Sequence, residues 1–515
     1  MTWRALTGKK SFWEKIVLLV YPYLLAYYPI FALRNYNIDY VDLASILRAL
    51  ILVTCGTLLI QAITLLSLRS LEKSSIIVSL IVISFLSYGH IYNLLEKVFG
   101  VPVHHRYLAG AEILLLSLAV FLVIRKSQFA RMFSQFLAVA SFVLIGIILF
   151  ESLRYDFRIY RATAAVLNDS SSQAESQLSA TRPDFYLIIL DGHTRSDVLS
   201  SRFDYDNSNF IQQLNALGFY VAACSQSNYA STKLSLVSSM FANYIQNFVQ
   251  EDQALPPLKA SAVNQTLRAL GYKTIAFENR AQGQFDLKED ITLSRNQMAL
   301  GRFNLSGGIN EFEKLLIDTS FMHFLVDTEV IPGLDKDTLL RWEDLEHYYQ
   351  TNFILSELER LPALPGPKFV YAHIMVPHSP FVFTADGSFS PNSSPIAGYR
   401  SNVEFIDNRL PSTLRAIIAN SDPNPIIIVM GDHGPATRKT ITPQMRMANL
   451  SAFLVNDAAK SQLYPTVTPI NAVRIILNTQ YGGTYPHLED LSYYAYKPAE
   501  LPGAEIIPNE CPISP

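Results

Sequence analysis

Apolar residues are concentrated in the first 152 positions of the 515-residue chain, and this distribution constrains the fold more than any other feature. Five apolar runs lie there, at residues 16–33, 43–67, 76–95, 107–124 and 133–150. A bilayer core about 30 Å thick requires about 20 mostly apolar residues in a helix. Polar stretches separate the runs, so we predict five transmembrane helices. The first run lacks a small-residue cleavage site and precedes four similar runs, which excludes a cleavable signal peptide.

The remaining composition supports this division of the chain. Only 17% of the residues are charged, whereas soluble domains carry about 25%. The formal net charge is −3 and no long basic run is present, which argues against a disordered chain and against a nucleic-acid-binding protein. We predict a five-span anchor at 1–152, a juxtamembrane helix and flexible linker at 153–182, and a soluble domain at 183–515.

The Lys and Arg residues of the short loops predict the orientation of the anchor. With a cytoplasmic N-terminus, the inside segments hold nine Lys and Arg residues and the outside segments seven, and four of the nine lie in the first tail. Five spans then place the soluble domain outside the cytoplasm. His90 and Glu112 lie within spans, where they either line a polar path or pair with neighbouring helices. Cys224 and Cys511 share the outer compartment in this topology, and the sequence leaves open whether they pair.

Strand and helix patterns alternate along the soluble domain. Apolar runs typical of buried strands lie at 184–190, 274–277, 369–374 and 426–430, and helical patterns lie between them at 209–217, 262–270, 344–361 and 403–419. This alternation predicts an α/β domain with a mostly parallel sheet and helices on both faces. Ligands bind such sheets at the carboxyl ends of the strands.

Polar turns follow three of the predicted strands. Asp191 follows the first strand, His378 follows the strand at 369–374, and Asp432 and His433 follow the strand at 426–430. Carboxylate and imidazole groups are ligands that Zn²⁺ and Mn²⁺ accept. The sequence therefore indicates a divalent metal site at this edge of the sheet.

A hydroxyl-rich segment at 225–241 offers a nucleophile for such a site. Ser231 and Thr232 immediately precede a predicted helix at 234–241. A divalent metal and the positive end of a helix dipole would lower the pKa of a hydroxyl there. The alternative is that one of the two merely caps the helix.

The ordered segments PDFYLIILDG, SNYASTKLSLVSSMF, KFVYAHIMVPHSPF and IIIVMGDHG resemble the alkaline phosphatase superfamily. The resemblance is to its membrane-anchored sulfatase-like branch, which includes lipoteichoic acid synthases and lipid A phosphoethanolamine transferases. It implies an alkaline phosphatase-like α/β fold. It also assigns roles to individual residues: Asp191, Asp432 and His433 as metal ligands, Thr232 as nucleophile and fourth ligand with Ser231 in reserve, and His378 as the group that binds phosphoryl oxygens or protonates the leaving group, with His373 a weaker candidate. Separately, Arg195 and Lys233 either add positive charge for the phosphate or are ordinary surface residues.

The sequence departs from parts of this superfamily. Cys224 is followed by Ser-Gln-Ser, so the Cys-x-Pro-x-Arg sequence that sulfatases convert to formylglycine is absent. A single Asp191 precedes Gly192 where sulfatases have paired aspartates. The additional histidines of two-zinc phosphatases are not evident, with His487 the one candidate. The resemblance therefore favours one divalent metal, Zn²⁺ or Mn²⁺, with Mg²⁺ as a further option.

The function that this resemblance implies is transfer of a phospho-alcohol group through a phospho-threonine intermediate. The donor would be a membrane phospholipid, the acceptor an envelope glycan or lipid, and the location the bacterial cytoplasmic membrane with the catalytic domain outside the cytoplasm. Two alternatives stay open: an extracytoplasmic hydrolase of phosphodiesters or sulfate esters, and an inactive envelope scaffold. The transferred group, either phosphoglycerol or phosphoethanolamine, the acceptor and the oligomeric state are not specified by the sequence.

Overall fold

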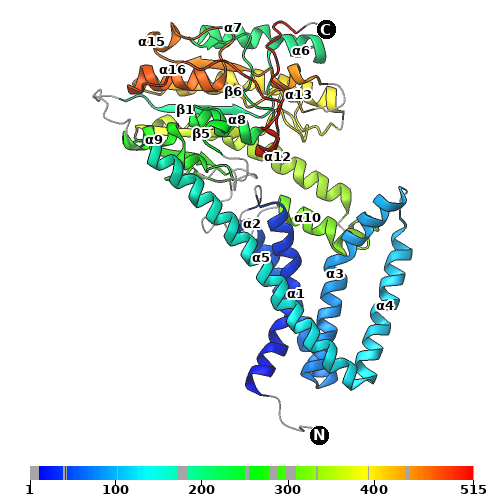
Figure 1. The fold of residues 1–515 in the computed structure, drawn as a ribbon. Coiled ribbons are helices and arrows are strands. Elements are labelled where there is room, and N and C mark those ends of the chain that lie inside the picture. The colour runs from blue at the N-terminus through cyan, green and yellow to red at the C-terminus, as the bar shows by residue number, and fades with distance from the viewer. Residues whose placement is uncertain are drawn as a thin grey trace. The chain divides into compact units, whose positions relative to one another are not determined.

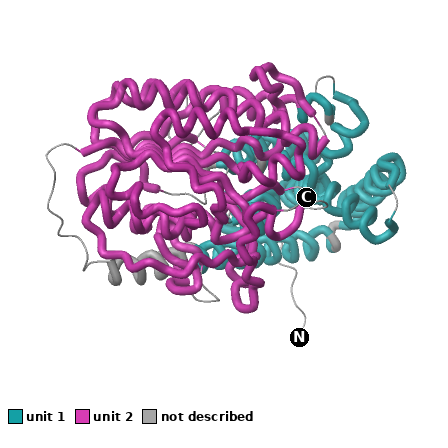
Figure 2. Tube along the Cα trace, turned by 90° about the horizontal axis from the view of Figure 1, so that it is seen from above, with its two compact units in different colours: residues 1–155, 298–340 teal, residues 156–297, 341–515 magenta. Residues whose placement is uncertain are grey.

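The computed structural model describes residues 11–38, 41, 43–100, 103–170, 182–249, 254–278, 287–295, 309–331, 335–392, 394–436 and 441–513. The chain divides into two compact units (Figure 2). Unit 1 comprises residues 1–155 and 298–340, and unit 2 comprises residues 156–297 and 341–515.

Unit 1 contains five long apolar helices, as the sequence predicts (Figure 1). They are α1 (Phe12–Tyr36), α2 (Leu43–Leu68), α3 (Leu71–Phe99), α4 (His105–Arg125) and α5 (Ser127–Ser170). Each is long and apolar enough to cross a membrane. Helix α5 continues without a break through the predicted juxtamembrane helix and into the first three residues of the linker predicted at 168–182. Residues 171–181 of that linker lie outside the described residues.

The surfaces of these helices suit a lipid environment. Leu58, Leu66 and Leu114 are more than half exposed, whereas Leu25 and Ile76 are buried between helices. One polar contact joins two of these helices: Ser84 of α3 donates a hydrogen bond to Glu112 of α4 over 2.7 Å. This contact agrees with the interpretation that Glu112 pairs with a neighbouring helix.

Unit 1 also includes a segment from the second half of the chain. Helices α10 (Glu311–Thr319) and α11 (Met322–Asp327) pack against α3, and α10 also contacts α1 and α2. Phe312 of α10 is buried in one apolar cluster with Ile30, Ile46 and Ala49. The sequence assigned the whole of 183–515 to the soluble domain and did not anticipate this return to the membrane helices.

Unit 2 is built on a seven-stranded sheet in the order β2-β7-β6-β1-β5-β3-β4. Four strands occur where the sequence predicts them: β1 (Phe185–Leu190), β3 (Lys273–Phe277), β5 (Lys368–Ile374) and β6 (Ile426–Gly431). Strand β1 pairs in parallel with β5 and β6, and β3 pairs in parallel with β5 and β4 (Ile291–Leu293). The sequence analysis did not include β4, β2 (Tyr220–Val221) or β7 (Ser451–Leu454), of which β7 is antiparallel to both β6 and β2.

Helices cover both faces of this sheet (Figure 1). Phe185, Leu187 and Ile189 of β1 join one apolar core, which includes residues of α8 (Thr232–Phe241), α9 (Ala262–Ala269) and α16 (Pro469–Tyr481). The intervening β1 residues join the other core with α7 (Ser208–Ala216), α12 (Lys336–Leu358) and α13 (Pro395–Ala419). The fold class predicted from the sequence is confirmed.

Shorter elements complete unit 2. Among the described residues they are the α-helices α6 (Ser196–Phe203), α14 (Pro443–Met447) and α15 (Asp457–Lys460), and the 3₁₀ turns at Ile245–Asn247, Leu258–Ala260, Leu361–Ala363 and Pro498–Glu500. A disulfide joins Cys224 to Cys511, a pairing that the sequence left open, and Cys55 on α2 is a free cysteine.

Candidate active site

The central strands β6, β1 and β5 are parallel neighbours, so their carboxyl ends lie at the same edge of the sheet. Asp191 follows β1 directly, and Asp432 and His433 follow β6. All three side chains are buried. The backbone N–H of Gly192 donates a hydrogen bond to Asp432 Oδ1 over 2.8 Å, which joins the two strand ends.

Glycine is required beside both strand ends. Gly192 has a φ of +76°, a conformation that side-chain-bearing residues rarely adopt. A Cβ atom on Gly431 would lie 2.1 Å from the carbonyl oxygen of His193. The two glycines that the sequence shows beside Asp191 and Asp432 therefore permit a close approach of backbone segments.

His373, on β5, lies beside these side chains. It pairs in register with Ile189, and its Nε2 atom lies 3.2 Å from Asp191 Oδ2. Ligand atoms of Asp191, His373 and Asp432 all lie within 4.8 Å of one another. The sequence analysis held His373 only as a weaker phosphate-binding candidate, because a histidine inside a strand carries no turn signal. We call Asp191, His373, Asp432 and His433 the sheet-edge cluster.

The chemistry of the sheet-edge cluster fits a divalent cation. Asp191 Oδ1 and Asp432 Oδ2 are buried and have no hydrogen-bond donor among the described residues. Leaving a buried carboxylate oxygen unpaired is costly. A cation bound between these oxygens would compensate both negative charges.

The tautomer of His433 agrees with the same role. Its Nδ1–H donates to the carbonyl oxygen of Gly434 over 2.9 Å, which leaves Nε2 unprotonated and able to act as an acceptor. That Nε2 atom lies 3.1 Å from Asp432 Oδ2 and 3.1 Å from Thr232 Oγ1. Burial lowers the pKa of His433 to about 4, and Arg446 acts in the same direction, so the imidazole is neutral at physiological pH. A neutral imidazole with a free Nε2 lone pair is the form that binds metals.

Helix α8 places Ser231 and Thr232 differently. Ser231 is the N-cap, and its Oγ accepts a hydrogen bond from the backbone N–H of Leu234. Thr232 is the first residue of the helix, and its hydroxyl donates to His433 Nε2. Ser235 of the same helix donates to the carbonyl oxygen of Asp432 over 2.5 Å. The structure therefore gives Ser231 the capping contact and brings Thr232 to the sheet-edge cluster.

His378 lies beside the cluster and is partly exposed. Its backbone N–H donates to the carbonyl oxygen of Asp191 over 3.0 Å, and its Nδ1 donates to the carbonyl oxygen of Ser379 over 2.7 Å. Burial raises the pKa of Asp191, but the nearby His378 and His373 outweigh burial and hold this pKa well below its ordinary value. Asp191 is therefore ionised, as a metal ligand must be.

Two further candidates from the sequence, Arg195 and His487, form contacts with residues outside the sheet-edge cluster. Arg195 is buried and donates to both oxygens of Asp197, to the side chain of Asn509 and to the carbonyl oxygen of Glu510, so its guanidinium anchors the C-terminal segment. His487 Nε2 lies 2.8 Å from the hydroxyl of Tyr464. We therefore leave both out of the proposed site.

Arg446 of α14 is a residue that the sequence analysis missed. Its Nε donates to the carbonyl oxygen of Ala230 over 2.8 Å, and one of its terminal nitrogens donates to that of Gly434 over 3.0 Å. It thereby joins the segment before Thr232 to the segment after His433. No motif in the sequence marks this arginine, because its role depends on two carbonyl groups more than 200 positions apart.

The family model named Sulfatase matches residues 183–471, which is more than half of the chain. No curated protein matches the sequence. Solved structures that resemble the chain include the periplasmic domain of EptC from Escherichia coli in complex with Zn, at 12% identity and a TM-score of 0.42, over 64% of this chain and 94% of that one. They also include the integral membrane lipooligosaccharide phosphoethanolamine transferase EptA from Neisseria meningitidis, at 12% identity and a TM-score of 0.36, over 89% and 94%, and a sulfatase-like protein from Bacteroides thetaiotaomicron, at 11% identity and a TM-score of 0.40, over 64% and 76%.

The chain belongs to the Sulfatase family. The resemblance to sulfatase-like proteins is thereby confirmed, and the protein is a sulfatase-like enzyme whose described residues include five helices long and apolar enough to cross a membrane.

Proposed function

We propose that the protein transfers a phospho-alcohol group, phosphoglycerol or phosphoethanolamine, from a membrane phospholipid to a hydroxyl of an envelope glycan or lipid. One observation carries the proposal: the hydroxyl of Thr232 lies 3.1 Å from His433 Nε2, at the start of α8 and near two buried carboxylate oxygens that accept no hydrogen bond from the described residues. This is the arrangement of an activated hydroxyl nucleophile next to a metal site. The disulfide and the loop charges support a catalytic domain outside the cytoplasm of a bacterium.

Asp191, Asp432, His433 and Thr232 would hold one divalent cation, Zn²⁺ or Mn²⁺, with His373 adjoining them. When bound, the cation supplies positive charge that lowers the pKa of the Thr232 hydroxyl and neutralises phosphoryl oxygens. Glycines 192 and 431 allow the strand ends to approach closely, and Arg446 fixes the nucleophile segment relative to His433.

The reaction has two steps. In the first, Thr232 Oγ gives its proton to solvent and attacks phosphorus, an Oγ–P bond forms, and the bond from phosphorus to the diacylglycerol oxygen breaks. His378, which is partly exposed, would give a proton to that oxygen and regain one from solvent. In the second step an acceptor hydroxyl attacks phosphorus, the Oγ–P bond breaks, and the acceptor's proton restores the Thr232 hydroxyl. Membrane helices in the same chain raise the effective concentration of a lipid donor.

The nucleophile is tested by comparing Thr232→Ala with Ser231→Ala in the full-length protein. Acyl-labelled phosphatidylglycerol and phosphatidylethanolamine are offered separately, and release of labelled diacylglycerol is measured. Thr232→Ala should lose activity by a factor on the order of a thousand or more, because removal of a covalent nucleophile abolishes the pathway. Ser231→Ala loses only a cap, costing about 1 kcal/mol of stability, and should keep its turnover. Equal turnover by wild type and Thr232→Ala would exclude Thr232 as nucleophile.

The metal is tested by removal and replacement. Chelation should abolish diacylglycerol release, and added Zn²⁺ or Mn²⁺ should restore it in wild type but not in Asp432→Asn. Activity that survives complete removal of metal, measured by elemental analysis, would contradict the proposal.

The fate of the phosphorylated group separates transfer from the two alternatives. A transferase leaves the group on an added envelope glycan or lipid, which mass spectrometry detects. A hydrolase releases free phospho-alcohol at the same rate with or without an acceptor. An inactive scaffold releases no diacylglycerol from either donor. It also binds no metal at the sheet-edge cluster.

A further inference from the structure

A second group of metal-ligating side chains lies in unit 1, apart from the sheet-edge cluster of unit 2. His105 is the first residue of α4, and His323 and Asp327 are one turn apart on α11. The ligand atoms of these three residues all lie within 4.8 Å of one another. We call them the α4–α11 cluster. Nothing in the proposed transfer reaction uses it.

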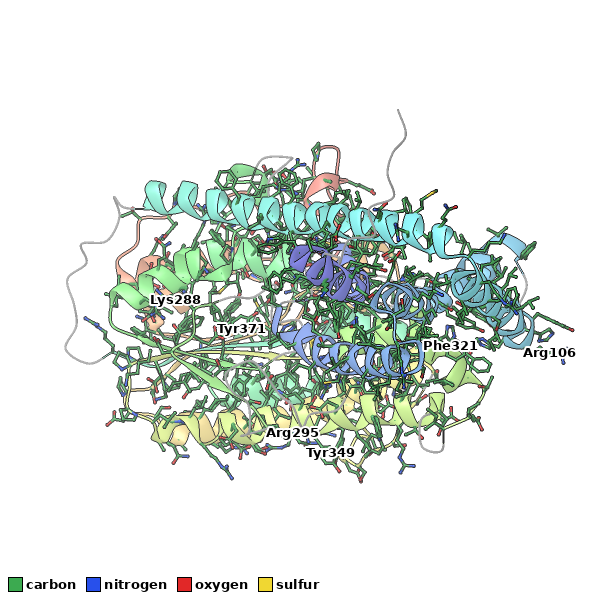
Figure 3. The ribbon with its side chains drawn as sticks, turned by 90° about the horizontal axis from the view of Figure 1, so that it is seen from below. Arg106, Lys288, Arg295, Phe321, Tyr349 and Tyr371 are labelled. Atoms are coloured by element: carbon green, nitrogen blue, oxygen red, sulfur yellow. A yellow bond between two sulfur atoms is a disulfide. The ribbon has the colours of Figure 1, made fainter. Side chains whose placement is uncertain are left out.

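The segment that carries α11 is held firmly against the membrane helices. Asn310 donates to the carbonyl oxygen of Ser45 over 3.0 Å, and Glu313 forms a two-point ion pair with Arg48. The backbone N–H of Phe321 donates to the carbonyl oxygen of Phe85 over 2.6 Å. Phe321 is labelled in Figure 3, as is Arg106, which follows His105 and lies at the outer edge of that view. The α4–α11 cluster is therefore part of a packed structure.

The distances within the cluster match those of a tetrahedral cation. Asp327 Oδ2 lies 3.2 Å from His105 Nε2 and 3.3 Å from His323 Nε2. Ligands about 2.0–2.1 Å from a tetrahedral Zn²⁺ are separated from one another by about 3.3 Å. Both imidazoles thus present the same nitrogen to one carboxylate oxygen at the spacing that a shared cation requires.

The surroundings of His105 suit a metal-binding tautomer. Its Nδ1 lies 3.0 Å from the hydroxyl of Tyr88, a fully buried residue whose hydroxyl also lies 3.4 Å from the carbonyl oxygen of His105. With Nδ1–H donating to Tyr88 and Tyr88 donating onward to that carbonyl, the Nε2 lone pair of His105 is free for a metal. Tyr92 stacks on the His105 ring with centroids 4.2 Å apart, which fixes the orientation of the ring. Such outer partners orient the histidine ligands of metal sites.

The cluster also leaves room for a further ligand. The side chain of Asp327 is 30% exposed, whereas those of His105 and His323 are 12% and 17% exposed. Three protein ligands with one open side are typical of zinc sites that retain a water molecule.

We propose that unit 1 binds one Zn²⁺ through His105 Nε2, His323 Nε2 and Asp327 Oδ2, with the fourth position open to water. Because His105 belongs to α4 and the other two ligands to α11, the ion joins the returning segment to a membrane helix. The site is independent of the transfer reaction proposed for unit 2.

The test uses the full-length protein in detergent with Asp191→Asn and Asp432→Asn, which disable the sheet-edge cluster. After chelation and back-titration, elemental analysis should find about one Zn²⁺ per chain, bound by the three remaining ligands. Co²⁺ in its place should give the visible absorption of a tetrahedral site. Hydrogen exchange of residues 322–327 should slow when Zn²⁺ is added, because binding stabilises the state that binds.

His323→Gln in this background should abolish Zn²⁺ binding and the slowed exchange. Glu329→Gln, which alters a carboxylate two positions beyond Asp327, should retain both. A background protein that elutes like wild type yet binds no Zn²⁺ would overturn the proposal in favour of a His–Asp–His hydrogen-bonded cluster. Unchanged Zn²⁺ binding by His323→Gln would also overturn the proposal.

Metal counts on wild-type protein that has been chelated and then refilled with Zn²⁺ supply a measurement that needs no variant. About two Zn²⁺ per chain are expected if both sites fill, and binding that leaves exchange of residues 322–327 unchanged would contradict the site.

Discussion

At the scale of single residues, the geometry around Thr232 depends on groups that do not belong to any recognisable motif. Arg446 is buried, with 8% of its surface exposed, and its planar guanidinium donates to the carbonyl oxygens of Ala230 and Gly434. A lysine ammonium lacks the planar fork of nitrogens with which the guanidinium donates to both carbonyl oxygens. Arg446 therefore joins the segment before Thr232 to the segment after His433, and we expect it to position the proposed nucleophile.

Arg446→Lys should lower both stability and the rate of the chemical step. Loss of hydrogen bonds from a charged group costs about 1.5–3 kcal/mol, and thermal unfolding followed by intrinsic fluorescence should show it. The rate of diacylglycerol release at saturating donor should fall more than KM changes, because donor binding is not altered. Arg409→Lys is the matched control: its pair with Glu359 is about one-third exposed on both sides and is worth only about 0.2–1 kcal/mol. If both variants keep wild-type turnover, Arg446 does not position the site.

At the scale of elements, the most informative contact is the approach of α10 to α3. A Cβ atom on Gly89 would lie 2.3 Å from the carbonyl oxygen of Asp318, so the two backbones meet where α3 has no side chain. A Cβ atom on Gly56 of α2 would meet nothing within 4 Å. Both glycines lie in membrane helices, and only the first is required by a neighbour.

Gly89→Ala should displace α10 and α11 from the membrane helices, because the added methyl group meets backbone atoms that cannot rotate away. Hydrogen exchange of residues 311–327 should become faster in Gly89→Ala and stay unchanged in Gly56→Ala. Identical protection in both variants would show that the returning segment does not dock against α3 in solution.

At the scale of the whole molecule, the disulfide between Cys224 and Cys511 links two distant parts of unit 2. Cys224 and Cys511 are 287 positions apart, and Asn509 beside the bridge donates to the carbonyl oxygen of Cys224 over 2.8 Å. Arg195 and Asp197 hold the same C-terminal segment, the latter by accepting the backbone N–H of Ile513. The C-terminal residues are thus tied to the segment that leads to Thr232.

Cys511→Ser should lower the unfolding free energy of unit 2 by about 2–5 kcal/mol, since the bridge restricts a long loop in the unfolded chain. A reductant should destabilise wild type and leave Cys511→Ser unchanged in thermal unfolding. Cys55→Ser removes the free cysteine on α2 and should behave like wild type with and without reductant. Equal unfolding temperatures for all three proteins under oxidising conditions would show that the bridge does not contribute.

Local patterns in the sequence were sufficient for the five membrane helices, the four main strands and the three polar turns. Hydrophobic length and periodicity specify each of these within a short stretch of chain. That Asp191, Asp432 and His433 lie together at one edge of the sheet could likewise be predicted, because the carboxyl ends of parallel strands collect polar side chains there.

Only the tertiary structure decided which distant groups meet. The parallel pairing of β1 with β5 brings His373 to Asp191, and the direction of α8 gives Ser231 the cap and Thr232 the contact with His433. The docking of Arg446 and the return of α10 and α11 to the membrane helices carry no local signal either. Strand order, register and backbone approach are set by packing between segments hundreds of residues apart, and no short stretch of sequence encodes such packing by itself.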